Sequence, residues 1–145
     1  MVNAVVLRDI EIDYGHTLPD HFSFCNQIHG HRAKITVAVE GELSEEKNSS
    51  NRGMVLDFKI LKEIMMKEIC DVLDHGFAVF KDDAVDLEFI RKRNKRFLVT
   101  DEPPTAEYLA KWAFFRIKEK LPSNIKLLRV EWKETPSNTA IYAEK

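Results

Sequence analysis

Three histidines and one cysteine lie within sixteen residues of one another near the start of the chain. His16 comes first, and Cys25, His29 and His31 follow in the segment Cys-Asn-Gln-Ile-His-Gly-His. Imidazole nitrogens and thiolates are ligands that zinc prefers in proteins. Three imidazoles with an open fourth position are typical of catalytic zinc, whereas a fourth ligand from Cys25 would close a structural site. The spacing therefore predicts a metal centre with His16, His29 and His31 as ligands.

Cys25 can serve such a centre without binding the metal. A nearby divalent cation favours the thiolate form of a cysteine, and a thiolate can accept a proton from a substrate. A domain of 145 residues is also large enough to fold without a structural metal ion. We therefore predict that Cys25 acts as a general base, with the four-ligand alternative left open.

Alternating residue types on either side of this segment predict two strands, at residues 4–14 and 32–41. Side chains two residues apart in a strand point to the same face of its sheet. The apolar faces and their continuations are Ile10, Ile12, Tyr14 and His16 in the first segment and His29, His31, Ala33, Ile35, Val37 and Val39 in the second. If the two strands form an antiparallel hairpin, the three imidazoles converge at one end of it.

Helical spacing of apolar residues predicts two helices in the rest of the chain. The first has Asp57 as its N-cap and runs to about Leu73, and the second has Thr105 as its N-cap. Two further strands are predicted at residues 128–132 and 139–143. The order ββ-α-α-ββ predicts an α+β domain in which two helices cover one face of a four-stranded antiparallel sheet.

The segment from residue 77 to residue 100 has no clear period. A short amphipathic helix at residues 83–93 and a short strand at residues 96–99 are both compatible with it. Residues 91–96 hold five cations in six positions. This run can be a solvated turn or an edge that gathers phosphate groups, and the sequence leaves both open.

Composition predicts a single globular domain over residues 1–145. Hydrophobic residues make up 44% of the chain and charged residues 32%, and the net charge of −2 does not favour a nucleic-acid or membrane partner. No apolar run approaches the roughly 20 residues of a membrane helix, and the start does not resemble a signal peptide. The two cysteines form neither a C-x-x-C motif nor a disulfide framework, so we expect a cytoplasmic protein.

Asp74, His75 and Glu134 are further candidates for chemistry. A carboxylate beside an imidazole raises the basicity of the imidazole, so Asp74 and His75 can form a proton-transfer pair. They can equally stabilise the helix end together with Gly76. Glu134 continues the apolar face of a strand, where a carboxylate needs a partner. It can form an ion pair there or accept two parallel N–H bonds from a guanidine-like ring edge.

Six short motifs together resemble the 6-pyruvoyltetrahydropterin synthase/6-carboxytetrahydropterin synthase family. They follow the order of the family and span nearly the whole chain, and they are specific as a set although each alone is weak. The motifs are His16; Cys25-x-x-x-His29-Gly30-His31; Gly53-Met54-Val55-Leu56-Asp57-Phe58; Leu73-Asp74-His75; Pro104-Thr105-Ala106-Glu107; and Glu134-Thr135 followed by Ala140-x-Tyr142. The resemblance implies the tunnelling fold, in which small α+β subunits form rings whose sheets close a barrel.

The resemblance also implies a role for each matching residue. The three histidines would bind Zn²⁺, and Cys25 would be the proton-abstracting thiolate. Asp74 and His75 would form a second proton-transfer pair, contributed by a neighbouring subunit. The substrate 7,8-dihydroneopterin triphosphate would lie between subunits of a homo-oligomer, a hexamer of two stacked trimers. The residues implied in binding it are Glu134 at the amino-pyrimidine edge of the pterin, with support from Thr105 and Glu107.

The spacing Cys-x-x-x-His-Gly-His resembles the 6-carboxy branch of the family, which belongs to the queuosine pathway. A folate-related branch has Glu in place of Cys25, and the pyruvoyl branch has a longer gap. The implied activity is that of a zinc-dependent lyase that forms 6-carboxy-5,6,7,8-tetrahydropterin and releases acetaldehyde and triphosphate. The alternatives are a 6-pyruvoyltetrahydropterin synthase, which only eliminates triphosphate, and a non-catalytic pterin-binding or structural-zinc protein.

The chain departs from the family pattern after Leu73-Asp74-His75. The family often has a Leu-Asn pair there, whereas this chain continues with Gly76-Phe77-Ala78-Val79, and the stretch to Pro104 is longer than in compact members. These departures concern the substrate-entry edge and the triphosphate contacts, and they leave the zinc and cysteine positions unchanged.

Overall fold

The order of helices and strands follows the sequence pattern over most of the chain. The computed structural model describes residues 2–21 and 23–145. The elements in this part are β1 (Asn3–His16), a 3-10 turn (Phe24–Asn26), β2 (His29–Glu42), α1 (Phe58–Met65), a π-helical turn (Met66–Cys70), α2 (Asp71–Leu73), β3 (Gly76–Phe80), α3 (Ala84–Arg93), β4 (Phe97–Thr100), α4 (Ala106–Lys118), β5 (Lys126–Thr135) and β6 (Asn138–Tyr142). The predicted α+β class is confirmed.

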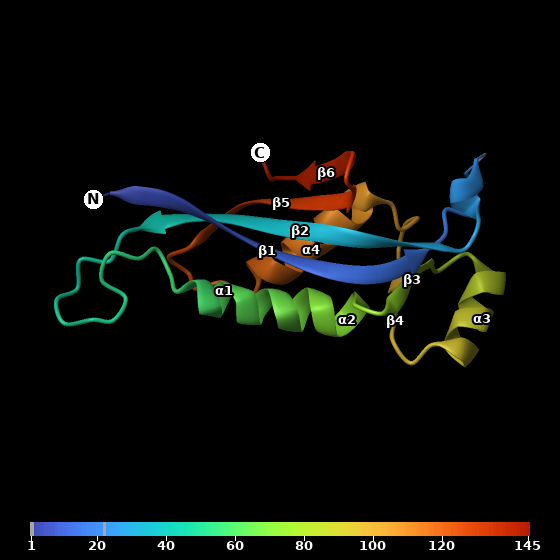
Figure 1. Ribbon diagram of the computed structural model, residues 1–145, viewed down its shortest axis with the longest axis horizontal. Coiled ribbons are helices and arrows are strands. Elements are labelled where there is room, and N and C mark those ends of the chain that lie inside the picture. The colour runs from blue at the N-terminus through green and yellow to red at the C-terminus, as the bar shows by residue number, and fades with distance from the viewer. Residues whose placement is uncertain (1, 22) are drawn as a thin grey trace.

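Strands β1 and β2 form a long antiparallel hairpin, as the alternation predicts (Figure 1). The two strands pair in a single register along their whole length, and the last pair is His16 opposite His29. The apolar face of the hairpin is buried, whereas charged residues on the other face pair across the strands, as Arg32 Nε does with Asp13 Oδ1 at 3.0 Å. A slip of one residue would exchange these faces, so burial fixes the register.

The sheet has six strands in the described residues, and the prediction of four antiparallel strands was wrong. The strand order is β4-β3-β1-β2-β5-β6, and β3 runs parallel to both β1 and β4. Residues 76–79 of β3 are all buried, so this strand has no polar face. A strand that is covered on both faces does not alternate, which is why the sequence pattern did not indicate it.

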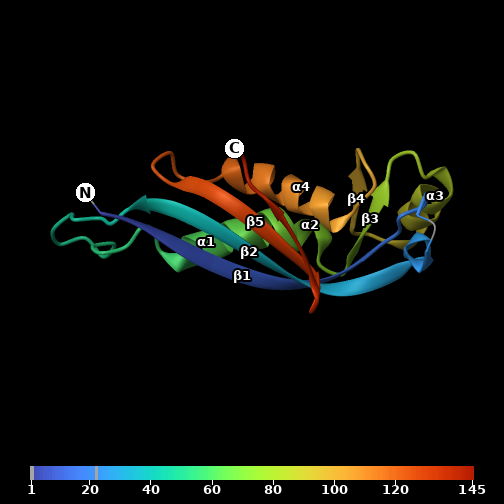
Figure 2. The same ribbon diagram turned by 90° about the horizontal axis from the view of Figure 1, so that it is seen from above.

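Helices α1, α2 and α4 cover one face of the sheet, and the core lies between the two layers (Figure 2). The predicted pair of helices on this face is confirmed. A third helix, α3, begins after its N-cap Asp83 and packs Ile90 against Phe77 and Val79 of β3. It therefore completes a small second cluster of apolar residues at one end of the sheet. None of the described helices is long and apolar enough to cross a membrane.

The first helical segment contains one π-helical turn and still ends at Leu73, where the sequence predicts its end. Glu68 in this turn is buried, and Arg116 of α4 contacts it twice. Arg116 Nη2 lies 2.9 Å from Glu68 Oε2, and Arg116 Nε donates to the Glu68 carbonyl at 3.0 Å. These contacts hold the two helical segments together, and the chain leaves Leu73 next to the end of β1, where Asp13 N donates to Asp74 Oδ1 at 2.9 Å.

Candidate metal centre and its surroundings

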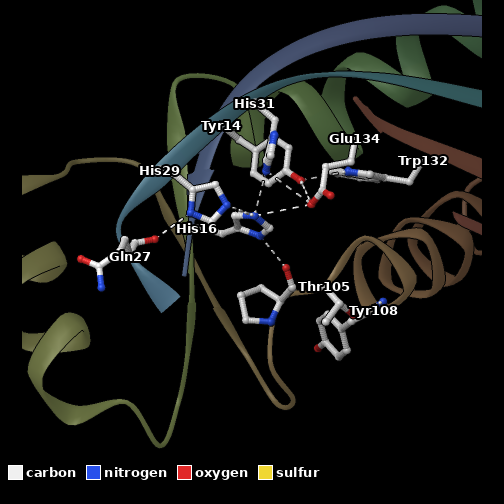
Figure 3. Close-up of polar contacts among 10 residues, drawn as sticks. Tyr14, His16, Gln27, His29, His31, Thr105, Tyr108, Trp132 and Glu134 are labelled. Carbon is white, nitrogen blue, oxygen red and sulfur yellow. Dashed lines mark hydrogen bonds and ion pairs between the residues drawn. The ribbon is translucent and has the colours of Figure 1, made fainter. Parts of the chain in front are cut away.

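The side chains of His16, His29 and His31 converge where β1 ends and β2 begins (Figure 3). The Nε2 atom of His16 lies 3.1 Å from the Nε2 atoms of both His29 and His31. A zinc ion bound tetrahedrally at about 2.0–2.1 Å would separate its ligand nitrogens by about 3.4 Å. The His16 nitrogen is therefore only slightly closer to the other two than a bound zinc ion would place it. The ligand atoms of all three side chains lie within 4.8 Å of one another, so the group could hold a metal ion.

Backbone carbonyls orient two of the three imidazoles. His16 Nδ1 donates to the carbonyl of Pro104 at 2.7 Å, and His29 Nδ1 donates to the carbonyl of Gln27 at 2.6 Å (Figure 3). A carbonyl oxygen can only accept, so the ring hydrogen must lie on Nδ1 in both residues. Nε2 is then left with a free lone pair that faces the other imidazoles, as a metal ligand requires.

Burial keeps His16 and His31 in the neutral form that binds metal. His16 is only 1% exposed, and burial lowers its pKa to about 4, against the opposing effect of the hydrogen bond to Pro104. Burial also lowers the pKa of His31, although the nearby Glu134 carboxylate raises it and His29 lowers it further. At neutral pH His16 and His31 are therefore neutral imidazoles rather than imidazolium ions, and a metal would not have to displace a second ring proton from either.

Glu134 lies directly beside the three histidines, on a chain of buried polar contacts (Figure 3). Its Oε1 atom is 3.5 Å from Nε2 of both His16 and His31, and the hydroxyl of Tyr14 is 3.5 Å from the same oxygen. Trp132 Nε1 donates to the Tyr14 hydroxyl at 3.2 Å, and burial raises the pKa of that hydroxyl. Tyr14 therefore stays protonated and orients the carboxylate from one side.

Cys25 lies on the 3-10 turn in the loop between β1 and β2, and it is partly exposed. The ligand atoms of the three histidines lie within 4.8 Å of one another, and the Cys25 sulfur does not join this group. The structure thus brings the histidines together without the cysteine. Its role as a general base stays a prediction.

Asp74 and His75 form an ion pair of their own next to the end of β1. Asp74 Oδ2 lies 3.2 Å from His75 Nδ1, and Asp74 Oδ1 accepts from the backbone of Asp13. His75 has a φ of 59°, and its backbone N–H donates to Asp13 O at 2.7 Å while its side chain is 78% exposed. Among the described residues the structure records no contact from either member of the pair to His16, His29 or His31. Proton transfer by this pair remains a prediction.

Thr105 and Glu107 lie at the start of α4, just after Pro104, whose carbonyl accepts from His16. Thr105 caps the helix as predicted, because its Oγ1 accepts from Tyr108 N at 3.1 Å. The carbonyl of the preceding residue, Pro104, accepts from His16 Nδ1, so the start of α4 also orients one of the predicted metal ligands. Glu107 is exposed in the first turn of α4. Neither side chain is brought against the histidines, and their predicted part in substrate binding stays a prediction.

Sequence reasoning missed the contacts that support the site. Tyr14 and Trp132 each precede a site residue by two positions, which places them on the same face of their strands as His16 and Glu134. This parity was a signal that could have identified them. The carbonyls of Pro104 and Gln27 carried no such signal, since every residue has a carbonyl.

The chain is similar to proteins of a known family over nearly its whole length. Residues 6–145 match the family described as 6-pyruvoyl tetrahydropterin synthase. A 6-carboxy-5,6,7,8-tetrahydropterin synthase of Haemophilus influenzae is 30% identical over 142 residues, which cover 96% of this chain and 98% of that protein. A protein of Pyrococcus horikoshii, provisionally named 6-carboxy-5,6,7,8-tetrahydropterin synthase, is 39% identical over 146 residues, which cover 92% and 84% of the two chains.

The fold is similar to that of solved structures. The 6-pyruvoyl tetrahydropterin synthase of Caenorhabditis elegans superposes with a TM-score of 0.72 and 26% sequence identity. The superposition covers 100% of this chain and 98% of that one. The strands and helices described above therefore form a known arrangement over their whole length.

Proposed function

Because the chain belongs to the 6-pyruvoyl tetrahydropterin synthase family, we propose that it is a zinc-dependent lyase of the 6-carboxy branch. The proposed reaction converts 7,8-dihydroneopterin triphosphate and one water molecule to 6-carboxy-5,6,7,8-tetrahydropterin, with release of acetaldehyde and triphosphate, as a step of queuosine biosynthesis. The convergence of three imidazole nitrogens, in a chain whose relatives carry the 6-carboxy name, supports this proposal most directly.

The residues of the site have distinct proposed roles. Zinc bound by the three histidines supplies a Lewis acid for the side-chain hydroxyls of the substrate. Cys25 takes the proton from the side-chain carbon next to the pterin ring. Asp74 and His75 move the proton at the following carbon. Glu134 accepts N–H bonds from the pyrimidine edge, and its carboxylate is suited to this because it is 22% exposed and lines a hollow of about 500 Å³.

Assembly into a closed homo-oligomer follows from the same proposal. The sheet ends in two open edges, β4 and β6, in the described residues, and open edges must be paired or protected. Among the described residues, the structure also records no hydrogen bond or ion pair between the Asp74–His75 pair and His16, His29 or His31, so the pair is available to a neighbour. We expect a hexamer of two trimers, and light scattering at micromolar concentration should give about six times the 16.9 kDa of one chain. A monomer under these conditions would contradict the assembly.

The product distinguishes the proposed reaction from its alternatives. Carbon–carbon cleavage needs an oxygen anion to be stabilised while a proton is delivered to the departing two-carbon fragment. Zinc-loaded protein given 7,8-dihydroneopterin triphosphate should form acetaldehyde and 6-carboxy-5,6,7,8-tetrahydropterin in equal amounts, as measured by chromatography. Formation of 6-pyruvoyltetrahydropterin without acetaldehyde would indicate the pyruvoyl activity of the Caenorhabditis elegans neighbour. Binding of the compound with no product would indicate a pterin-binding protein.

A further inference from the structure

A basic hollow lies beside His75, formed by the end of α3 and the connection to β4. It has a volume of about 580 Å³, and it is lined by Asp74, His75, Arg93, Asn94, Lys95 and Arg96. The chain has a net charge of −2, yet it gathers five of its 22 Lys and Arg residues in residues 91–96. Figure 1 shows α3 at the same end of the sheet as the loop that carries Cys25, and Thr17 of that loop donates to Asp86 of α3 at 3.0 Å.

The cationic side chains of this hollow differ in whether they have a partner within the protein. Arg96 is tied to the backbone, because its Nη1 donates to the carbonyls of Cys70 at 3.0 Å and Asp74 at 2.9 Å. It thereby fixes the segment that carries His75. Arg93 and Lys95 are exposed, and among the described residues neither makes an ion pair or a side-chain hydrogen bond. Two charges of the same sign are thus held at the rim of one hollow without a protein partner.

Helix stability accounts for only part of this run. Arg91, Lys92 and Arg93 lie in the last turn of α3, where cations interact favourably with the helix dipole. Lys92 also pairs with Glu88 at 2.9 Å. Arg96 follows the end of the helix and is accounted for by its bonds to the two carbonyls. Lys95 also follows the helix end, where the dipole does not explain it, and a ligand with several negative charges would give it a partner.

His75 lines the same hollow, and its proposed role indicates which anion would bind there. In the proposed reaction, Asp74 and His75 remove a proton from the carbon next to the one that carries the triphosphate. As that C–H bond breaks, its electron pair forms a C=C bond, the proton goes to His75, and the C–O electron pair leaves with the triphosphate. Negative charge therefore builds up one bond away from the atom at which His75 acts. Guanidinium and ammonium groups are the usual partners of phosphate oxygens.

We infer that Arg93 and Lys95 bind the triphosphate group of the substrate in the hollow beside His75. The inference rests on the proposed function and extends it to the leaving group. The same hollow would then supply both the proton-transfer pair and the cations for the departing anion. His75 also lines a second hollow of about 520 Å³, to which His29 and His31 contribute.

Inorganic triphosphate tests this inference without any turnover. Isothermal titration calorimetry on the full-length, zinc-loaded protein should detect its binding, and the R93A/K95A double variant should bind it at least about tenfold more weakly, since charged hydrogen bonds are lost. The affinity should also fall with added salt, and less steeply in the variant. A K59A/K62A double variant is the matched control, because it loses two exposed lysines of α1 outside the hollow. The control should bind triphosphate as the unchanged protein does.

Equal affinity in the R93A/K95A variant and the unchanged protein would overturn the inference, as would an equal loss in the control. The result is independent of the product assay. A protein that makes the expected product but binds triphosphate without Arg93 and Lys95 would retain the proposed function and lose this inference. A protein that binds triphosphate through these residues but makes neither pterin product would retain this inference and lose the proposed function.

Discussion

Replacing His29 or His31 with alanine should reduce bound zinc from one ion per chain to almost none. Each imidazole contributes one of three convergent nitrogens, and two remaining ligands cannot hold the ion against water at neutral pH. Metal content after dialysis, measured by mass spectrometry of the protein solution, gives the result directly. Circular dichroism should show that both variants retain their fold, because the sheet is held by burial along the whole hairpin and the metal lies at one end.

His21→Ala is the matched control for zinc binding. His21 lies in the same loop region but outside the group of convergent ligand atoms. The variant should therefore keep one zinc ion per chain. Full zinc occupancy in both His29→Ala and His31→Ala would show that the metal is held elsewhere, and the assignment of the centre would be wrong.

Replacing Cys25 with alanine should leave zinc in place and slow turnover by roughly 10²-fold or more, the usual effect of losing a general base. The physical reason is that the Cys25 sulfur lies outside the group of convergent nitrogens, so its removal takes no ligand from the metal. The measurement is a pair of assays on the same preparation, metal content and rate of product formation. Cys70→Ala is the control, because Cys70 is buried in the helix layer and has no proposed role.

Loss of zinc in the Cys25→Ala variant would contradict this assignment. It would mean that the loop moves to bring the thiolate to the metal as a fourth ligand, which gives a closed site. Unchanged turnover with zinc retained would remove Cys25 from the mechanism and leave the metal centre intact.

The convergence of the three histidines was the part of the molecule best predicted from sequence. Strand parity put His16 on the buried face of β1 and His29 and His31 on the matching face of β2, and the observed register brings them together. The prediction worked because a buried hairpin has one register and each residue has one face. The first residues of the two long helical segments were predicted equally well, because the N-caps Asp57 and Thr105 are residue types that favour this position.

The middle of the chain was predicted less well for a physical reason. Strand β3 is covered on both faces and only five residues long, so it has neither alternation nor length to distinguish it. Its parallel pairing with β1 joins segments about 60 residues apart, as in the pair Tyr14 and Gly76. Such a pairing depends on how the whole domain packs. The position of the Asp74–His75 pair depends on this strand, so local sequence patterns could not predict that position.

The uninterrupted register of β1 and β2 also limits how the gene for this chain can change in length. His16 is the last residue of β1, and His29 is the first of β2. A single codon inserted into or deleted from either strand would turn the histidine beyond it to the opposite face, and the site would be lost although every ligand is still encoded. Codons gained or lost between residues 17 and 28 would leave the pairing of His16 with His29 unchanged. Surviving length variation is therefore expected to collect in this loop, and the two strands are expected to keep a constant length over evolution.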